Sequence, residues 1–94
     1  MRQDINNKII NYLSQYNPTR IGIFGSYARN EDNSQSDIDI LIDFPENISL
    51  FDIGGIKYDL TEILQRSVDI VSERGLNKRL KESIHKDLMI IFGT

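Results

Sequence analysis

Apolar residues recur every three or four positions in three parts of the chain. This spacing places them along one face of a helix, with polar residues on the other face. The apolar positions are Ile5, Ile9, Tyr12, Leu13 and Tyr16, then Leu50, Ile53, Ile56, Leu60, Ile63 and Leu64, and finally Leu76, Leu80, Ile84 and Leu88. The pattern predicts amphipathic helices over residues 4–16, 49–65 and 76–88.

Short runs rich in β-branched residues alternate with these helices. Proline or glycine bounds the first two runs, as is typical of buried strands. The runs cover residues 20–24, 36–44 and 68–72. A short helix is predicted over residues 26–30, and the apolar stretch 89–92 is predicted to pair or to pack.

The order of these elements indicates the fold class. Helices and strands alternate along the chain, and no shift in composition suggests a linker. The connection over residues 26–35 is short for a crossover between parallel strands, so we expect a mixed sheet. The expected fold is one α/β domain over residues 1–94, with a three-stranded mixed sheet flanked by about four helices.

Composition and charge exclude several classes of protein. Hydrophobic residues make up 39% of the chain and charged residues 27%, which is unlike disordered or membrane proteins. With 11 Lys and Arg against 14 Asp and Glu, the net charge is −3, so we expect no direct nucleic-acid binding and no attraction to a membrane. The chain has no cysteine and one histidine, His85, which excludes thiolate and zinc sites. Without a leader-like segment, the expected location is the cytoplasm.

Three aspartates occupy matching positions on two predicted strands. Asp37 and Asp39 share a strand face, with Cα atoms roughly 6.7 Å apart, while Ile38 faces the other way. Asp69 lies between two apolar residues on a later strand, so the three carboxylates are predicted to converge. Like charges at one point are unfavourable unless a cation lies between them, and Mg²⁺ prefers oxygen ligands. Two such ions would hold the attacking oxygen and the leaving oxygen during a displacement at phosphorus. The alternative is that these aspartates are ordinary residues on a solvent-facing strand.

The segment before these aspartates contains a candidate phosphate site. Gly25 permits a positive φ and a close backbone approach, and the N–H groups that follow Ser26 can face a phosphate. Alternatively, Gly25 only turns the chain and Ser26 caps a helix. Arg29 lies one helical turn later, where it could reach a phosphate oxygen or a partner acid, or stay an exposed arginine.

These residues together resemble a known family. Gly25-Ser26, the sequence DID at Asp37 to Asp39, and the later strand acid Asp69 are similar to the nucleotidyltransferase superfamily related to DNA polymerase beta. The length and the stretch GSYAR to SDIDILID resemble its minimal nucleotidyltransferase (MNT) group, whose members often accompany a HEPN-domain protein as toxin and antitoxin. Many relatives carry glycine where this chain has Asn30, and asparagine also tolerates a left-handed backbone.

The resemblance implies a small nucleotidyltransferase fold and a set of residue roles. Gly25 and Ser26 would contact nucleotide phosphates, Asp37 and Asp39 would ligate both Mg²⁺ ions, and Asp69 would be a metal ligand and general base. The implied reaction is the transfer of AMP from ATP to a hydroxyl, with a tyrosine of a cognate HEPN toxin as acceptor. The chain would then be an antitoxin that acts by modification.

Two other functions stay open at this point. The chain could be a nucleotide-binding or non-catalytic module that neutralises its partner by covering it, although Gly25, Ser26 and the three aspartates are all intact. Transfer of AMP to a small molecule such as an aminoglycoside is disfavoured, because 94 residues leave no room for a substrate domain.

Overall fold

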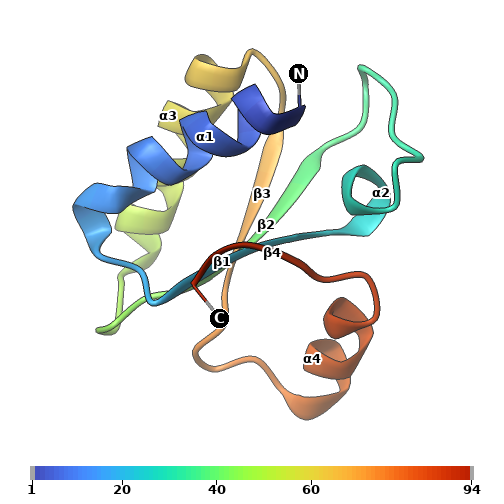
Figure 1. Ribbon diagram of the computed structural model, residues 1–94. Coiled ribbons are helices and arrows are strands. Elements are labelled where there is room, and N and C mark those ends of the chain that lie inside the picture. Colours follow the sequence, from blue (N-terminus) through green and yellow to red (C-terminus); the bar gives the residue numbers. More distant parts are fainter. Residues whose placement is uncertain (1, 94) are drawn as a thin grey trace.

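The computed structural model describes residues 2–93, in which helices and strands alternate (Figure 1). The helices are α1 (Arg2–Leu13), α2 (Gly25–Ala28), α3 (Leu50–Leu64) and α4 (Lys78–His85), and a 3-10 turn (Ser14–Tyr16) extends α1. The strands are β1 (Arg20–Phe24), β2 (Ile38–Asp43), β3 (Val68–Ser72) and β4 (Met89–Gly93). The α/β class is confirmed, and the predicted bounds of the first and third strands are correct.

The four strands form one mixed sheet in the order β3-β2-β1-β4. β2 runs antiparallel to β1 and parallel to β3, and β4 runs antiparallel to β1. The prediction of a mixed sheet is confirmed, but the prediction of three strands is wrong, because the apolar segment at Met89–Gly93 pairs with the free edge of β1. A short apolar run suits both pairing and packing, and only the presence of an open edge decides between them.

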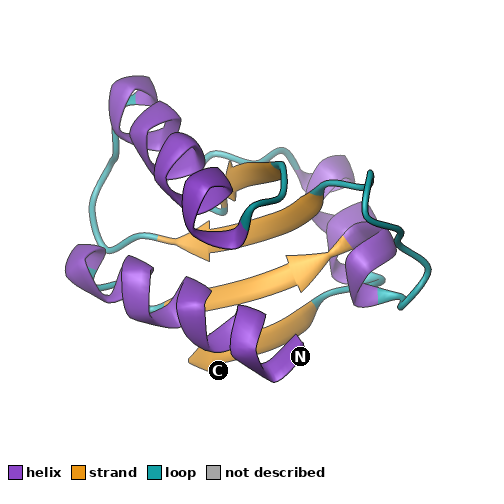
Figure 2. Ribbon diagram, turned by 90° about the horizontal axis from the view of Figure 1, so that it is seen from above, coloured by secondary structure: helices purple, strands orange, loops and turns teal. Residues whose placement is uncertain are grey.

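Helices α1 and α3 lie on the same side of the sheet, and α4 lies on the opposite side (Figures 1 and 2). The core between the sheet and the helices α1 and α3 is apolar, and its most buried members come from these two helices and from β1, β2 and β3. They are Ile9 and Leu13 of α1, Ile21 and Ile23 of β1, Ile38, Ile40 and Ile42 of β2, Ile56 and Leu60 of α3, and Val68 of β3. The alternation in β2 therefore turns Asp39 to the opposite side of the sheet, as the sequence predicts.

Local capping fixes the ends of α3 and α4. The Ser49 side chain accepts a hydrogen bond from the Asp52 amide, and the Asp52 carboxylate accepts one from the Ser49 amide, which forms a capping box. Gln65 ends α3 in the left-handed conformation. The last helix begins two residues later than predicted because the Asn77 side chain caps it by accepting from the Leu80 amide, and it ends three residues earlier, at His85. Among residues 2–93, no helix combines the length and the apolar composition needed to cross a bilayer.

Candidate active site

The parallel pairing of β2 with β3 places Asp39 directly opposite Asp69. Asp37 stands just before the first residue of β2, and the strand begins where the Ile38 amide donates to the Ser67 carbonyl at 3.0 Å. Burial raises the pKa of Asp39 above its usual value, and the nearby charges of Asp69 and Asp37 raise it further. The structure therefore places Asp39 beside Asp69, with Asp37 near enough at the same end of the sheet for its charge to act on Asp39.

Gly25 lies against the carboxylate of Asp39. Its φ is +76°, and a Cβ atom at this position would overlap Asp39 Oδ2. The pairing of Phe24 with Asp39 across β1 and β2 causes this contact, because Gly25 is the next residue after Phe24. A residue with a side chain would meet both a strained backbone and a clash. Gly25 therefore brings a bare stretch of backbone beside the acidic cluster.

The turn around Ser26 is a single turn of helix, so its dipole is small and any phosphate contact there depends on close backbone approach. Asn30 adopts a φ of +62°. The expectation that asparagine retains the left-handed turn is therefore confirmed. The Glu31 amide then donates to the Ser26 carbonyl at 2.9 Å, which closes the turn.

Arg29 lies near the carboxylates but is held by other acids. Its Nε lies 2.8 Å from Glu31 Oε1, and its Nη1 lies 2.6 Å from Asp87 Oδ2. The charge of Arg29 acts to lower the pKa of Asp39, against the larger effects that raise it. The structure thus places Arg29 beside the cluster, in exposed ion pairs that cost little to exchange.

Lys57 is a member of this site that sequence reasoning missed. It lies on α3, and its Nζ reaches Asp69 Oδ1 at 3.5 Å around β3, the edge strand of the sheet. Both side chains are about half exposed, so the pair contributes little to stability. On the sequence Lys57 is one polar position on an amphipathic helix, and no local signal connects it with a strand residue 12 positions later.

The donor atoms of the cluster suit a hard divalent cation. Asp37, Asp39 and Asp69 offer only carboxylate oxygens, which are the ligands that Mg²⁺ prefers. Within residues 2–93, no three acidic or histidine side chains already meet at metal-binding geometry. The exposed Asp37 side chain would therefore have to turn inward. A cation would also relieve the like-charge repulsion that raises the pKa of Asp39.

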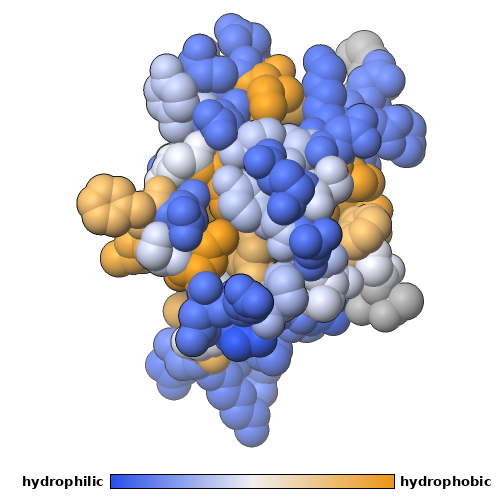
Figure 3. Space-filling model, turned by 90° about the vertical axis from the view of Figure 1, so that its left-hand side faces the viewer, coloured by the Kyte–Doolittle hydropathy of each residue, from blue (hydrophilic) through white to orange (hydrophobic). Residues whose placement is uncertain are grey.

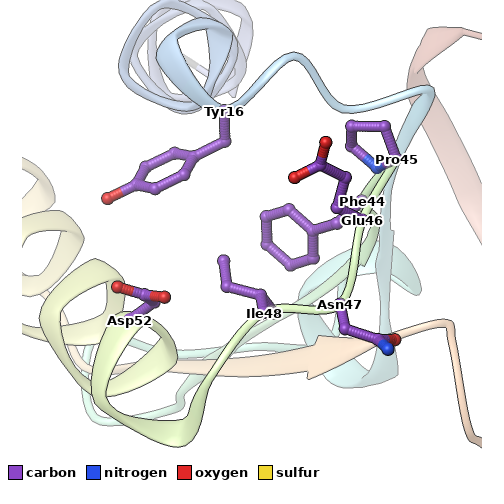
Figure 4. Close-up of a pocket in the computed structure, with 7 residues that line it drawn as sticks. All are labelled: Tyr16, Phe44, Pro45, Glu46, Asn47, Ile48 and Asp52. Atoms are coloured by element: carbon purple, nitrogen blue, oxygen red, sulfur yellow. The ribbon is translucent and has the colours of Figure 1, made fainter.

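A cavity of about 220 Å³ lies at the far end of β2 from the aspartates (Figure 4). It is lined by Tyr16, Phe44, Pro45, Glu46, Asn47, Ile48 and Asp52. Its charged groups are two carboxylates, Glu46 and Asp52, which would repel a triphosphate.

Several apolar side chains are exposed on the face of the molecule shown in Figure 3, and at the start of α3 Leu50 and Phe51 are 86% and 94% exposed.

Comparison with known proteins identifies the family. Residues 7–92 match the model of the nucleotidyltransferase domain. The chain belongs to this family, and it is a nucleotidyltransferase. Its relatives place it more narrowly among the minimal nucleotidyltransferases.

Three relatives show this narrower similarity. "Putative protein adenylyltransferase MJ0435" of Methanocaldococcus jannaschii is 44% identical over 81 residues, which cover 86% of this chain and 87% of that protein. A toxin-antitoxin crystal structure with AMP-PNP superimposes with a TM-score of 0.88 at 26% identity, covering 95% of this chain and 73% of the other. The second structure is that of a tri-AMPylated HEPN toxin of Shewanella oneidensis in complex with an MNT antitoxin. One of its chains superimposes with a TM-score of 0.84 at 26% identity, covering 100% of this chain and 74% of the other.

Proposed function

We propose that this nucleotidyltransferase transfers AMP from ATP to a hydroxyl group in a reaction that depends on Mg²⁺. One observation supports this function above all. Asp39 lies between Asp69, its partner across the parallel strands, and the bare backbone of Gly25. This arrangement sets oxygen ligands for a metal beside a surface that a phosphate can approach closely.

The residues of the chain would divide the work as follows. The backbone at Gly25-Ser26 would receive the triphosphate, and Arg29 would leave Glu31 or Asp87 for a phosphate oxygen. Asp37 and Asp39 would hold two Mg²⁺ ions, and Asp69 would hold one of them and accept a proton. Bound Mg²⁺ supplies charge neutralisation and acidifies a hydroxyl near it.

In the chemical step, the acceptor oxygen forms a bond to the α-phosphorus while the bond to pyrophosphate breaks. The hydroxyl proton passes to Asp69, and pyrophosphate leaves with the electron pair of the broken bond. Positioning and electrostatic stabilisation would supply most of the acceleration, as in phosphoryl transfer generally. Lys57 would pair with Asp69 until the metal ion takes its place.

We further propose that the acceptor is a tyrosine of a cognate HEPN toxin, so that the chain acts as the antitoxin of the pair. Two solved relatives support the pairing of the chain with a HEPN toxin. One is a toxin-antitoxin complex with AMP-PNP, an ATP analogue, and the other is an MNT antitoxin with a toxin that carries AMP groups. Neutralisation by binding alone is the competing function, and the experiment below separates the two.

The test mixes the purified protein with Mg²⁺, ATP labelled on its α-phosphate, and the product of the neighbouring gene, which we expect to be the HEPN protein. The wild-type chain should label the HEPN protein, and the double variant Asp37→Asn, Asp39→Asn should not. Asp43→Asn is the matched control, because Asp43 belongs to the same strand and its carboxylate accepts from Thr19 Oγ1 at 2.8 Å, away from the site. Neutralisation without labelling, or equal neutralisation by the double variant, would favour simple binding.

A further inference from the structure

The loop between α2 and β2 is held by a carboxylate that two arginines share. Asp32 Oδ1 accepts from Arg2 Nη2 at 2.5 Å, and Asp32 Oδ2 accepts from Arg66 Nη2 at 3.0 Å. The Asp32 side chain is only 7% exposed. Arg2 lowers the pKa of Asp32, so the carboxylate is ionised in the folded protein.

Arg66 also binds the backbone directly before Asp37. Its Nη2 donates to the carbonyl groups of Asn33 and Ser36, each at 3.0 Å. Ser36 is the residue before Asp37, and Arg66 itself lies three residues before Asp69. A single guanidinium therefore connects the segment that carries Asp37 to the turn that leads into the strand of Asp69.

The same group of side chains contacts the turn that follows Gly25. The guanidinium carbon of Arg2 lies 4.0 Å from the centre of the buried Tyr27 ring, and that of Arg66 lies 5.6 Å from it. Arg2 Nη1 also donates to the Tyr27 carbonyl at 2.9 Å. We call Arg2, Tyr27, Asp32 and Arg66 the arginine clamp.

We propose that Arg66, acting through the arginine clamp, is a positioning residue that holds the backbone of Asp37 beside the metal site, so that only the side chain has to turn for the carboxylate to bind the metal ion. This inference rests on the proposed function. Residues 31–37 contain no helix or strand, and Asp37 stands outside the sheet ladder. Without the clamp, the free loop would allow Asp37 many positions, and ordering it would weaken metal binding.

The test compares Arg66→Met with a control that breaks a similar ion pair at the other end of the sheet. Arg20 and Glu73 form that pair, with side chains 23% and 10% exposed, so Arg20→Met should destabilise the fold without moving Asp37. Mn²⁺ serves as a paramagnetic probe of the metal site, and its affinity is measured by electron paramagnetic resonance. Hydrogen exchange of the amides of residues 31–37 is measured on the same samples.

For Arg66→Met we expect Mn²⁺ binding about tenfold weaker than for the wild type, because removing a residue that orients a metal ligand costs this much or more. Exchange of residues 31–37 should become faster. Arg20→Met should keep the wild-type Mn²⁺ affinity despite a lower melting temperature. Arg66→Lys can serve fewer acceptors and should fall between, and it decides the matter if Arg66→Met does not fold.

Equal Mn²⁺ affinity in wild type, Arg66→Met and Arg66→Lys would overturn the positioning role. Losses of affinity that follow the melting temperature alike in the Arg66 and Arg20 variants would also overturn it, because they would reflect general destabilisation. A wild-type protein that binds no Mn²⁺ would instead overturn the proposed metal-dependent function, and this role with it.

Discussion

Gly25 and Asp39 are in such close contact that a methyl group on Gly25 would overlap the Asp39 carboxylate. The two residues are neighbours because β1 ends beside the start of β2, with Phe24 paired to Asp39. This contact joins the glycine turn and the acidic cluster into one site. It also makes Gly25 sensitive to substitution for two separate reasons, its positive φ and the nearby carboxylate.

The Gly25→Ala variant should lose AMP transfer and fold less stably. Alanine at positive φ costs about 1 kcal/mol, and the overlap with Asp39 should add about 1–3 kcal/mol, as overpacking does. Gly75→Ala is the matched control, because Gly75 has a φ of +85° and open space around its Cβ position. Urea denaturation should show the larger loss for Gly25→Ala, and equal losses would mean that Asp39 does not crowd Gly25.

The Asp39→Asn variant should be more stable than the wild type at neutral pH, by about 0.5–2 kcal/mol, as is common when a functional group under strain is removed. The folded state raises the pKa of Asp39 above 3.8, so the folded protein binds the proton more tightly than the unfolded chain. The destabilisation by ionised Asp39 therefore disappears as the pH falls through the raised pKa toward 3.8.

Urea denaturation at pH 7 and at pH 3.5 measures this difference. The advantage of Asp39→Asn should be present at pH 7 and largely absent at pH 3.5. Asp43→Asn, in the same strand, should gain no stability at either pH, because Asp43 accepts a hydrogen bond from Thr19. An Asp39→Asn variant less stable than the wild type at pH 7 would contradict the repulsion between the carboxylates.

Addition of Mg²⁺ should raise the melting temperature of the wild-type protein. Binding to the folded state alone stabilises it by about 2.7 kcal/mol at a free concentration 100 times the dissociation constant. Differential scanning fluorimetry with Mg²⁺, and again after EDTA, should show a reversible increase. The double variant Asp37→Asn, Asp39→Asn should show none, and a similar increase in both proteins would place the metal elsewhere.

The Lys57→Met variant should bind Mn²⁺ a few fold more tightly than the wild type. Lys57 Nζ lies 3.5 Å from Asp69 Oδ1, so its removal takes away a positive charge that competes with a cation, an effect of about 1 kcal/mol at the protein surface. Isothermal titration calorimetry at low salt measures it. Lys8→Met, on the exposed side of α1, is the control and should leave the affinity unchanged.

Much of the candidate site follows from local sequence. The alternation in β2 turns Ile38 and Ile40 into the core and Asp39 away from it, so the face of Asp39 could be predicted from β2 alone. The left-handed backbone at Asn30 and the positive φ of Gly25 could be predicted in the same way, because each depends on the preference of one residue.

Other features depend on residues that are distant in the sequence. The fourth strand exists because β1 has a free edge for Met89–Gly93, and Asp37 stands outside β2 because the ladder begins at Ile38. Several ion pairs at the site join residues far apart in the sequence. Arg29 pairs with Asp87, 58 positions away, Lys57 pairs with Asp69, 12 positions away, and Arg66 pairs with Asp32, 34 positions away. No local pattern specifies such pairs.

By itself, the sequence determined the class of fold, the faces of the strands and the residue types at the site, because periodicity and backbone preference act over a few neighbouring residues. Only the tertiary structure decided the fourth strand, the pairing of Asp39 with Asp69, and the charges that surround them. The physical reason is that strand register and ion pairs depend on which distant segments the core brings together.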